Sequence, residues 1–392
     1  MWPFGKKENY GELSLVFDIG SSSLGCSVFK FESSGNPLIL YSNREPILVQ
    51  ENLDFESFLN LTLSTLGKLV DKVHLEKFGR IDRVFCILSS PWFHSQTTNI
   101  KFEKNTPFVF NTKFADELIK KEVDLLLKKY KEEGNSNTNI LPIEMKTMSL
   151  SLNGYYVKNP LNHKATSLEM PIFVSLSEEF FIKEIEKIIN KAFHYKSIKF
   201  SSFLMASFTV ARDMFINQDK FLLINIGGEI TDISMIKKDI LRDNASFPMG
   251  VNFLVRGIVK GLKVDANEAR SLLHLYKDNH TNTENTKRLE AVIEPLKKTW
   301  LKNFQESLNN LSHDISIPST IFITVDQNLA EFFSQIIKEE ELNQYSLAES
   351  KFRIVFLGTE ALHGIVLFDE KKQIERDPLL IIESIYINRF LK

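Results

Sequence analysis

The sequence predicts an α/β fold of two related lobes, and two observations carry this prediction. An apolar strand, a turn rich in Gly or Ser and a second apolar strand occur at residues 13–31 and recur at residues 221–236. Between these copies, residues 89–175 differ in character, with short strand candidates around a single helix. A repeated unit with one interruption indicates two lobes, with an α+β subdomain inserted in the first.

Length and composition are those of a globular protein with ample core. The chain has 392 residues, of which 43% are hydrophobic and 25% charged, so it is long enough for two or three domains. Its net charge is −2 and Lys and Glu are intermixed, whereas a nucleic-acid-binding protein normally carries a basic face. We therefore expect no nucleic-acid partner. Cys26 and Cys86 lie in apolar runs and are expected to be reduced, buried thiols of a cytoplasmic protein.

Membrane contact, if any, is expected to be peripheral. No apolar stretch approaches the roughly 20 residues that cross a bilayer. The N-terminal segment Met1–Lys7 lacks the apolar region of a secretory signal. It sets Trp2 and Phe4 beside two lysines, a composition suited to the membrane interface.

The first lobe is expected to comprise residues 11–88, 176–216 and 370–392. Its predicted strands are residues 13–18, 24–31, 38–49 and 83–88, and its predicted helices are residues 54–73, 178–194 and 201–216. Asp377 is expected to cap a last helix that begins at Pro378.

The inserted subdomain, residues 89–175, has a predicted helix at 114–131, followed by the linker-like loop Glu132–Asn139. The second lobe is expected to span residues 217–369. Its predicted elements are strands at residues 221–226, 230–236 and 321–324, helices at 250–313 and 327–340, and a strand-rich stretch at 352–368.

The two turns have the composition of phosphate-binding loops. The first is Asp18–Ser23 and the second is Asn225–Asp232. Gly permits close approach of the backbone, whose consecutive N–H groups can surround a phosphate, and hydroxyls add donors. An Asp at a strand end can hold Mg²⁺ through water. One such loop alone is an ordinary tight hairpin, but its recurrence favours a shared phosphate site.

These residues resemble the actin superfamily. The first loop resembles the phosphate-1 motif, and the second the phosphate-2 motif, of actin, the sugar kinases and the bacterial actin homologues. Residues Ser246–Gly250 and Leu262–Ala269 resemble the bacterial branch that contains FtsA and PilM, which also carries an insertion at the position of residues 89–175. Within it, Leu152–Leu161 resembles an FtsA segment with a Lys-Asn-Pro corner. The resemblance implies an actin-like (ribonuclease-H-like) fold.

It also implies ATP and Mg²⁺ between the lobes. Asp18 would organise Mg²⁺ through water and, with Asn225, occupy the catalytic positions. The residues that would contact the nucleotide are Asp18, Gly20, Ser21, Ser22, Ser23, Gly227, Gly228, Thr231, Asp232 and Thr324.

Two departures qualify this ATP site. Asn225 stands where the family has an acidic residue, so it brings no charge and hydrolysis should be slow. The adenosine motif normally ends in glycines, but Val325–Gln327 has none. Phe356–Gly364 is an alternative with two glycines, although chain order and spacing favour residues 321–327.

Several functions are compatible with this fold. One is an FtsA-like division adaptor that self-associates at the inner face of the plasma membrane, switched by ATP and acting at most as a slow ATPase. Another is a PilM-like scaffold of type IV pilus assembly. The Lys-Asn-Pro corner suits the former, whereas the first loop suits the latter. Leu379–Lys392 follows Pro378 without a linker and is expected to be a core helix instead of the FtsA membrane anchor.

A sugar-kinase-like phosphotransferase and a nucleotide-free member are further alternatives. The insertion, with its charged helix at Lys120–Glu133, is a candidate partner surface.

Overall fold

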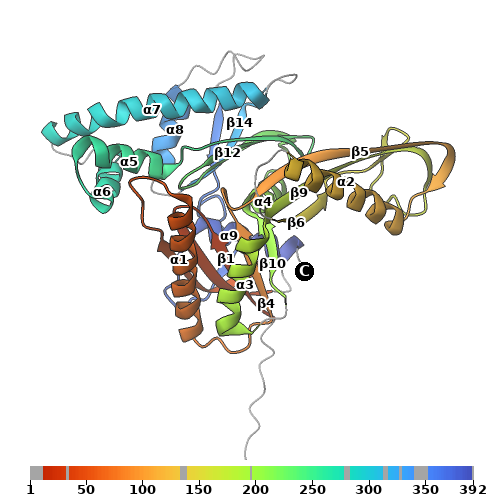
Figure 1. The fold of residues 1–392 in the computed structure, drawn as a ribbon, viewed down its shortest axis with the longest axis horizontal. Coiled ribbons are helices and arrows are strands. Elements are labelled where there is room, and N and C mark those ends of the chain that lie inside the picture. Colours follow the sequence, from red (N-terminus) through yellow and green to blue (C-terminus); the bar gives the residue numbers. More distant parts are fainter. Residues whose placement is uncertain are drawn as a thin grey trace, which may run out of the picture.

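The structure is a computed structural model that describes residues 12–31, 35–132, 139–194, 197–277, 283–311, 317–325, 329–339 and 352–390. Figure 1 shows the first lobe at the lower centre, the second lobe at the upper left and the insertion as an arm at the right. The predicted membrane-contacting segment Met1–Lys7 lies outside the described residues, as does most of the loop Glu132–Asn139.

The first lobe is built on a six-stranded sheet in the order β10-β4-β1-β2-β3-β16. Its strands are β1 (Leu13–Ile19), β2 (Ser23–Phe31), β3 (Pro37–Pro46), β4 (Arg83–Leu88), β10 (Lys199–Ser202) and β16 (Leu367–Phe368). Strand β1 pairs antiparallel with β2 and parallel with β4. The predicted hairpin at the start of the chain is thus confirmed.

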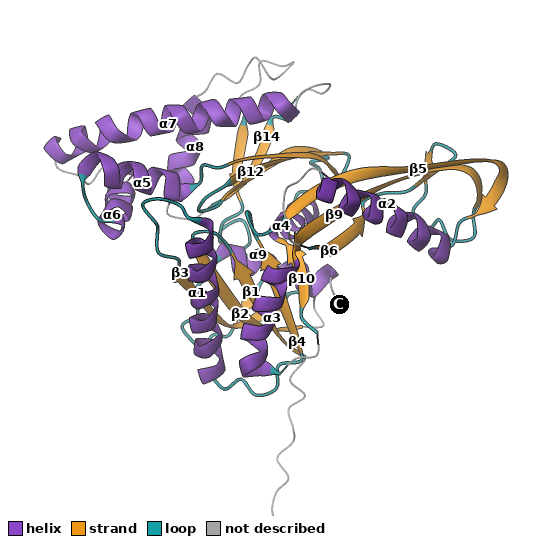
Figure 2. Ribbon diagram, viewed as in Figure 1, coloured by secondary structure: helices purple, strands orange, loops and turns teal. Residues whose placement is uncertain are grey.

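Helices cover both faces of this sheet, as Figure 2 shows. They are α1 (Phe55–Leu75), α3 (Glu179–Phe193), α4 (Phe203–Met214) and α9 (Pro378–Phe390). Alternate residues of β1 point to opposite faces. Phe17 packs in the cluster formed with α1 and α3, whereas Val16 packs with α4 and α9. Asp377 caps α9 by accepting the Leu379 and Leu380 N–H groups at 2.9 and 3.1 Å, as predicted.

The second lobe repeats this plan on a five-stranded sheet in the order β13-β12-β11-β14-β15. Its elements are β11 (Lys220–Ile226), β12 (Thr231–Lys237), β13 (Ile240–Phe247), β14 (Thr320–Thr324), β15 (Arg353–Phe356), α5 (Val251–Leu262), α6 (Ala266–Lys277), α7 (Thr283–Leu311) and α8 (Ala330–Glu339). Strand β11 pairs antiparallel with β12 and parallel with β14, just as β1 pairs with β2 and β4. The internal repeat is therefore structural.

The two lobes share one hydrophobic core. Phe221 and Phe322, from the second sheet, belong to the same buried cluster as Val16 of the first sheet and Phe208 of α4. The other face of the second sheet forms a separate core with α5, α7 and α8, centred on Trp300. Helices α4 and α9 therefore lie between the sheets and fix one lobe against the other.

The insertion forms its own antiparallel sheet and one helix, an α+β unit as predicted. Its elements are β5 (His94–Val109), α2 (Thr112–Glu132), β6 (Ile140–Thr147), β7 (Ser151–Leu152), β8 (Tyr155–Tyr156) and β9 (Lys164–Glu178). Glu144, buried on β6, accepts hydrogen bonds from the Ser201 hydroxyl at 2.6 Å and the Tyr386 hydroxyl at 2.5 Å. These bonds attach the arm to β10 and α9 of the first lobe.

Two expected boundaries are corrected. Residues 367–368 were expected in the second lobe, but Leu367 and Phe368 pair with Leu38 and Ile39 and extend the first sheet. This pairing satisfies the backbone groups of β3, which would otherwise be an edge strand. Strand β3 also ends at Pro46, before the expected residue 49.

Two further expectations concern the thiols and the membrane. Cys26 and Cys86 are both free and buried, as predicted. Within the described part of the chain, no helix is long and apolar enough to cross a bilayer.

Candidate functional site between the two hairpin loops

The first loop joins β1 to β2 with its backbone held close. A Cβ on Gly20 would lie 2.9 Å from the Ser23 carbonyl oxygen, so the turn requires glycine there. The indole N–H of Trp92 donates to the Gly20 carbonyl at 3.0 Å and fixes the loop from outside. Trp92 is itself stacked between Phe58 and Phe181, at centroid distances of 5.1 and 4.3 Å. The loop is thus positioned by the core of the first lobe.

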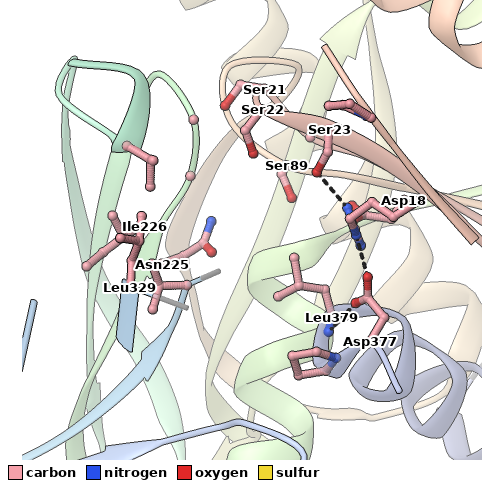
Figure 3. Close-up of a pocket in the computed structure, with 18 of the residues that line it drawn as sticks. Asp18, Ser21, Ser22, Ser23, Ser89, Asn225, Ile226, Leu329, Asp377 and Leu379 are labelled. Carbon is pink, nitrogen blue, oxygen red and sulfur yellow. Dashed lines mark hydrogen bonds and ion pairs between the residues drawn. The ribbon is translucent and has the colours of Figure 1, made fainter. Parts of the chain in front are cut away.

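The second loop lies directly against the first. A Cβ on Gly228 would be only 2.5 Å from the Ser22 nitrogen and 2.6 Å from the Ser21 carbonyl carbon. The Glu229 N–H donates to the Ser21 hydroxyl at 3.0 Å. Figure 3 shows Ser21, Ser22 and Ser23 on one side of the site and Asn225 and Ile226 on the other. The two turns that match in sequence therefore meet in space.

Helix α5 supports the second loop at its N-terminus. The Val251 and Asn252 N–H groups donate to the Gly227 and Gly228 carbonyls at 2.9 and 2.8 Å. A Cβ on Gly250 would lie 2.2 Å from the Gly227 oxygen, which explains the glycine that ends the Pro-Met-Gly turn. These bonds use the free N–H groups of the helix start. Within the loop, the Gly227 N–H donates to the Ile230 carbonyl, and the Glu229 N–H reaches Ser21 of the first lobe.

Glu229 is a buried anchor of this loop. Its carboxylate receives both terminal nitrogens of Arg256, at 3.0 and 2.5 Å, and the Asn252 amide at 2.8 Å. The side chain is 5% exposed. A carboxylate held by three donors on its own lobe has a structural role in fixing the loop.

Arg44 connects the first loop to the last helix. Its guanidinium donates to Asp18 Oδ2 at 2.7 Å, to the Ser23 hydroxyl at 3.0 Å and to Asp377 Oδ2. Burial lowers the pKa of Arg44, but the Asp377 and Asp18 carboxylates outweigh it and raise that pKa overall. Since Asp377 also caps α9, this cluster ties β1, β2, β3 and α9 together.

Glu383 of α9 lies in the same buried region. Burial, and then the negative charge of Asp18, raise the pKa of Glu383 well above its usual range. Burial likewise raises the pKa of Asp18, although the Arg44 guanidinium opposes this shift.

Asn225 and Asp232 face each other across the second hairpin. Asn225 Oδ1 accepts the Thr324 hydroxyl at 3.0 Å, and Asp232 accepts the Ser90 hydroxyl at 2.9 Å. Burial raises the pKa of Asp232 to about 6, although the hydrogen bonds from Ser90 and Asn225 oppose this shift. Both side chains are thus engaged in fixed polar contacts.

A cavity of about 440 Å³ lies between the lobes, within the size range of about 300–1,000 Å³ of small-ligand sites. The predicted residues that line it are Asp18, Gly20, Ser21, Ser22, Ser23, Asn225, Gly227 and Gly228. Three other predicted residues do not line it. Thr231 and Thr324 are buried and bonded to the Met249 carbonyl and to Asn225, and Asp232 borders a separate, smaller cavity.

Several residues that line the cavity were not predicted from the sequence. They are Arg44, Arg270, His274, Glu375, Arg376 and Asp377. Arg270 and His274 are four residues apart on α6 and so lie on one face of that helix. A glycine inside the apolar strand β2, Gly25, was the available signal for Arg44, because such a glycine often marks a close approach.

Both candidate adenosine stretches end near this cavity. Val325 lines it, whereas Asp326 and Gln327 lie outside the described residues. Gly358 and Glu360 line an adjoining cavity of about 360 Å³ whose walls include Val325 and Pro378. Because β14 and β15 are parallel neighbours, the two stretches lie side by side.

ATP fits this geometry better than Mg²⁺ does. Ser21, Ser22 and Ser23 line the cavity, and the Ser21 and Ser23 hydroxyls, which accept from Glu229 and Arg44, keep their own O–H for a phosphate oxygen. Mg²⁺ bound through water needs a hydrated carboxylate. Asp18 is 1% exposed, and Arg44 occupies its carboxylate. Among the residues described, no group of three His, Cys, Asp or Glu side chains could hold a metal ion.

The fold of this chain is similar to that of solved structures. A chain of the PilM-PilN type IV pilus biogenesis complex superposes with a TM-score of 0.65 at 13% identity, over 96% of this chain and 98% of that chain. The MamK double helical filament gives a TM-score of 0.46 at 10% identity, over 95% and 97%. A Bacteroides thetaiotaomicron protein with an actin-like ATPase fold gives 0.40 at 11%, over 90% and 94%.

Sequence comparison gives no relative: no protein family model matches, and no curated protein is similar. At these identities the likeness concerns the fold alone. The repeated hairpins, their common strand connectivity and the superposition on the PilM-PilN chain lead to one conclusion. The chain has the actin-like ATPase fold.

Proposed function

We propose that the chain is a nucleotide-binding scaffold that holds ATP between its lobes and works with protein partners of a type IV pilus-like assembly. The observation that carries this proposal is the meeting of the two hairpin loops, with Glu229 N–H bonded to Ser21, at a cavity of about 440 Å³. A ligand there touches both lobes, so its binding favours the closed arrangement over any open one.

Residues lining the cavity divide it into two ends. Ser21, Ser22, Ser23, Gly227 and Gly228 would receive the phosphates at the loop end. The nucleoside would lie toward α5, α6 and the start of α8, where the lining includes Val255, Leu273, His274, Val325 and Leu329. An apolar wall with a few polar groups is the usual surface for a base and a sugar.

Turnover is proposed to be slow or absent. Asn225 has no negative charge, and its amide oxygen already accepts the Thr324 hydroxyl. Glu229 is held by Arg256, and Asp232 is buried against Ser90. Two of the three described cavity carboxylates, Asp18 and Asp377, are paired with Arg44, and the third, Glu375, comes from the segment before α9 and belongs to neither loop. A general base needs a free acceptor beside the attacking water, which none of the five bonded acidic or amide side chains supplies.

The PilM-PilN likeness supports the pilus alternative over the division role. The insertion is the proposed partner surface, because its tip exposes aromatic and aliphatic side chains, among them Tyr155, Tyr156 and Leu161, at 77%, 70% and 53%. Genes beside this one give an inexpensive test: pilus assembly genes would support the proposal, whereas a tubulin-like division gene would favour the FtsA-like role.

ATP binding is tested by calorimetric titration of the purified chain. We expect measurable affinity for ATP, and a loss of about tenfold in Ser22→Ala, which removes a cavity hydroxyl worth about 1.4 kcal/mol when it contacts phosphate. Ser64→Ala, an exposed serine on α1, is the matched control and should bind as the wild type does. No affinity for any nucleotide would favour the nucleotide-free alternative. ATP consumption that depends on a small acceptor would instead favour a phosphotransferase.

A further inference from the structure

We infer that the nucleotide site works without a divalent cation, because the Arg44 guanidinium stands where the first-loop carboxylate would otherwise hold hydrated Mg²⁺. This inference rests on the proposed ATP binding and states how the phosphates are neutralised there. It differs from the expectation that Asp18 organises Mg²⁺ through water.

Asp18 is buried and already paired with Arg44. Its side chain is 2% exposed, and its Oδ2 atom lies 2.7 Å from Arg44 Nη2. Mg²⁺ keeps most of its hydration shell when bound through a carboxylate and so needs room for several waters beside the oxygen atoms. A guanidinium in hydrogen-bond contact occupies that room and already supplies the positive charge.

The Arg44 guanidinium is fixed by three partners. Asp18, Ser23 and Asp377 take three of its five N–H groups, from one side chain on each of β1, β2 and the start of α9. The two remaining N–H groups have no partner among the described residues. Arg44 lines the cavity and is 18% exposed. It is therefore an ordered cation with donors to spare at the edge of the phosphate loop.

The first hairpin leaves room for the Arg44 side chain. Gly25 lies opposite Asp18 in the β1–β2 register, and a Cβ there would be 2.8 Å from Arg44 Nη2 and 3.0 Å from its Cζ. The equivalent rung of the second hairpin, Asn225 opposite Asp232, carries side chains on both strands. Because Gly25 has no side chain, the hairpin has room for the Arg44 guanidinium, which comes from β3.

The charged side chains of the described lining are equal in number only when Arg44 is counted. Among the described residues, three arginines and three carboxylates line the cavity, namely Arg44, Arg270, Arg376, Asp18, Glu375 and Asp377. Without Arg44 the lining would have a net negative charge and would repel a triphosphate. With Arg44 in place the described lining is neutral, and the Arg44 guanidinium is a fixed cation beside the first loop.

The test compares ATP binding by the full chain in EDTA and in excess MgCl₂, using calorimetry. We expect dissociation constants that agree within about threefold. A dissociation constant at least about tenfold weaker in EDTA would overturn the inference while leaving the proposed function standing. Absence of binding in both buffers would overturn the proposed function, and this inference with it.

A variant pair assigns the effect to Arg44. Arg44→Gln should weaken ATP binding in EDTA by about tenfold or more, because it removes the charge but keeps a polar side chain. Arg80→Gln, whose side chain is 91% exposed in the same lobe, is the control and should bind as the wild type does. Wild-type affinity in Arg44→Gln would overturn the inference. Circular dichroism checks the fold of both variants, and the comparison of the two buffers decides the matter without any variant.

Discussion

The two hairpins at the cleft have one backbone plan and two different electrostatic designs. In the first, Asp18 lies opposite Gly25, and in the second, Asn225 lies opposite Asp232. Each rung therefore has one carboxylate, on the first strand in one hairpin and on the second strand in the other. The first carboxylate is paired with an arginine, whereas the second is held by the Ser90 hydroxyl.

The tips of the two loops differ in the same way. Ser22 lines the cavity, but Glu229, at the matching position of the second loop, turns into its own lobe and binds Arg256. The first hairpin is thus braced by a charge cluster on the cavity side, and the second by a cluster behind it. The two copies of the loop therefore differ in role: the first presents hydroxyl groups to the cavity, and the second is held rigid by the pair of Glu229 and Arg256.

The largest expected effect comes from removing the cation of the first hairpin. Arg44→Met should lower the free energy of unfolding by about 3–5 kcal/mol, because it leaves Asp18 and Asp377 buried without their cationic partner. Urea unfolding followed by circular dichroism measures this loss. Arg80→Met is the matched control and should change stability by less than about 0.5 kcal/mol. A loss below about 1 kcal/mol in Arg44→Met would mean that the cluster does not brace this hairpin.

The matching change in the second hairpin should cost less. Glu229→Gln keeps the shape of the side chain but loses its charge against Arg256, which is partly reached by solvent at 16% exposure. We expect a loss of about 2–3 kcal/mol, the range for hydrogen bonds to a charged group. Ser22→Ala, at the equivalent position of the first loop, should cost less than about 0.5 kcal/mol in the same urea experiment. Equal losses in the two variants would contradict the division of tasks.

Sequence alone predicts the fold well and the cleft in part. The hairpin repeat is local, so the strands around both loops, the glycine turns and the cap at Asp377 are readable from short windows. Gly20, the three serines and Gly227–Gly228 line the cavity as expected. The side chains of Thr231 and Thr324 turn away, because hydroxyls near a strand end can equally satisfy backbone or amide partners.

The Arg44 cluster could not be predicted in this way. Arg44 comes from β3 and Asp377 from the start of α9, 333 positions away along the chain, so no spacing rule connects them. Only Gly25 hinted at the contact, since a glycine within an apolar strand marks a close approach without naming its partner. Long-range charge pairs depend on the packing of whole elements, and short-window patterns do not contain that information.

The carboxylate of the second hairpin gives the next effect, with a defined pH dependence. An unfolded Asp has a pKa of about 3.9, whereas burial raises that of Asp232 to about 6. Between these values the folded protein binds more protons than the unfolded one, so stability falls as pH rises from about 4 to about 6. Asp232→Asn should remove this fall and raise stability at pH 7 by about 1–2 kcal/mol.

Thermal or urea unfolding across this pH range measures the Asp232 contribution. Asp219→Asn, an exposed carboxylate beside the start of β11, is the control and should leave the pH profile unchanged. If Asp232→Asn were less stable than the wild type at pH 7, Asp232 would have to be ionised by a favourable partner.

The smallest expected effect lies where the hairpins touch. Ser21→Ala removes the acceptor of the Glu229 N–H, a bond of 3.0 Å that joins the two lobes. The free energy of unfolding should fall by about 1 kcal/mol, the net value of such a bond. Amide hydrogen exchange at Glu229 should become faster while exchange within β11 stays unchanged, because the opening is local. Ser22→Ala is the control for this exchange. If Ser21→Ala left the Glu229 amide protected, the two loops would be held together by the close packing of the Gly228 backbone against Ser21 and Ser22 alone.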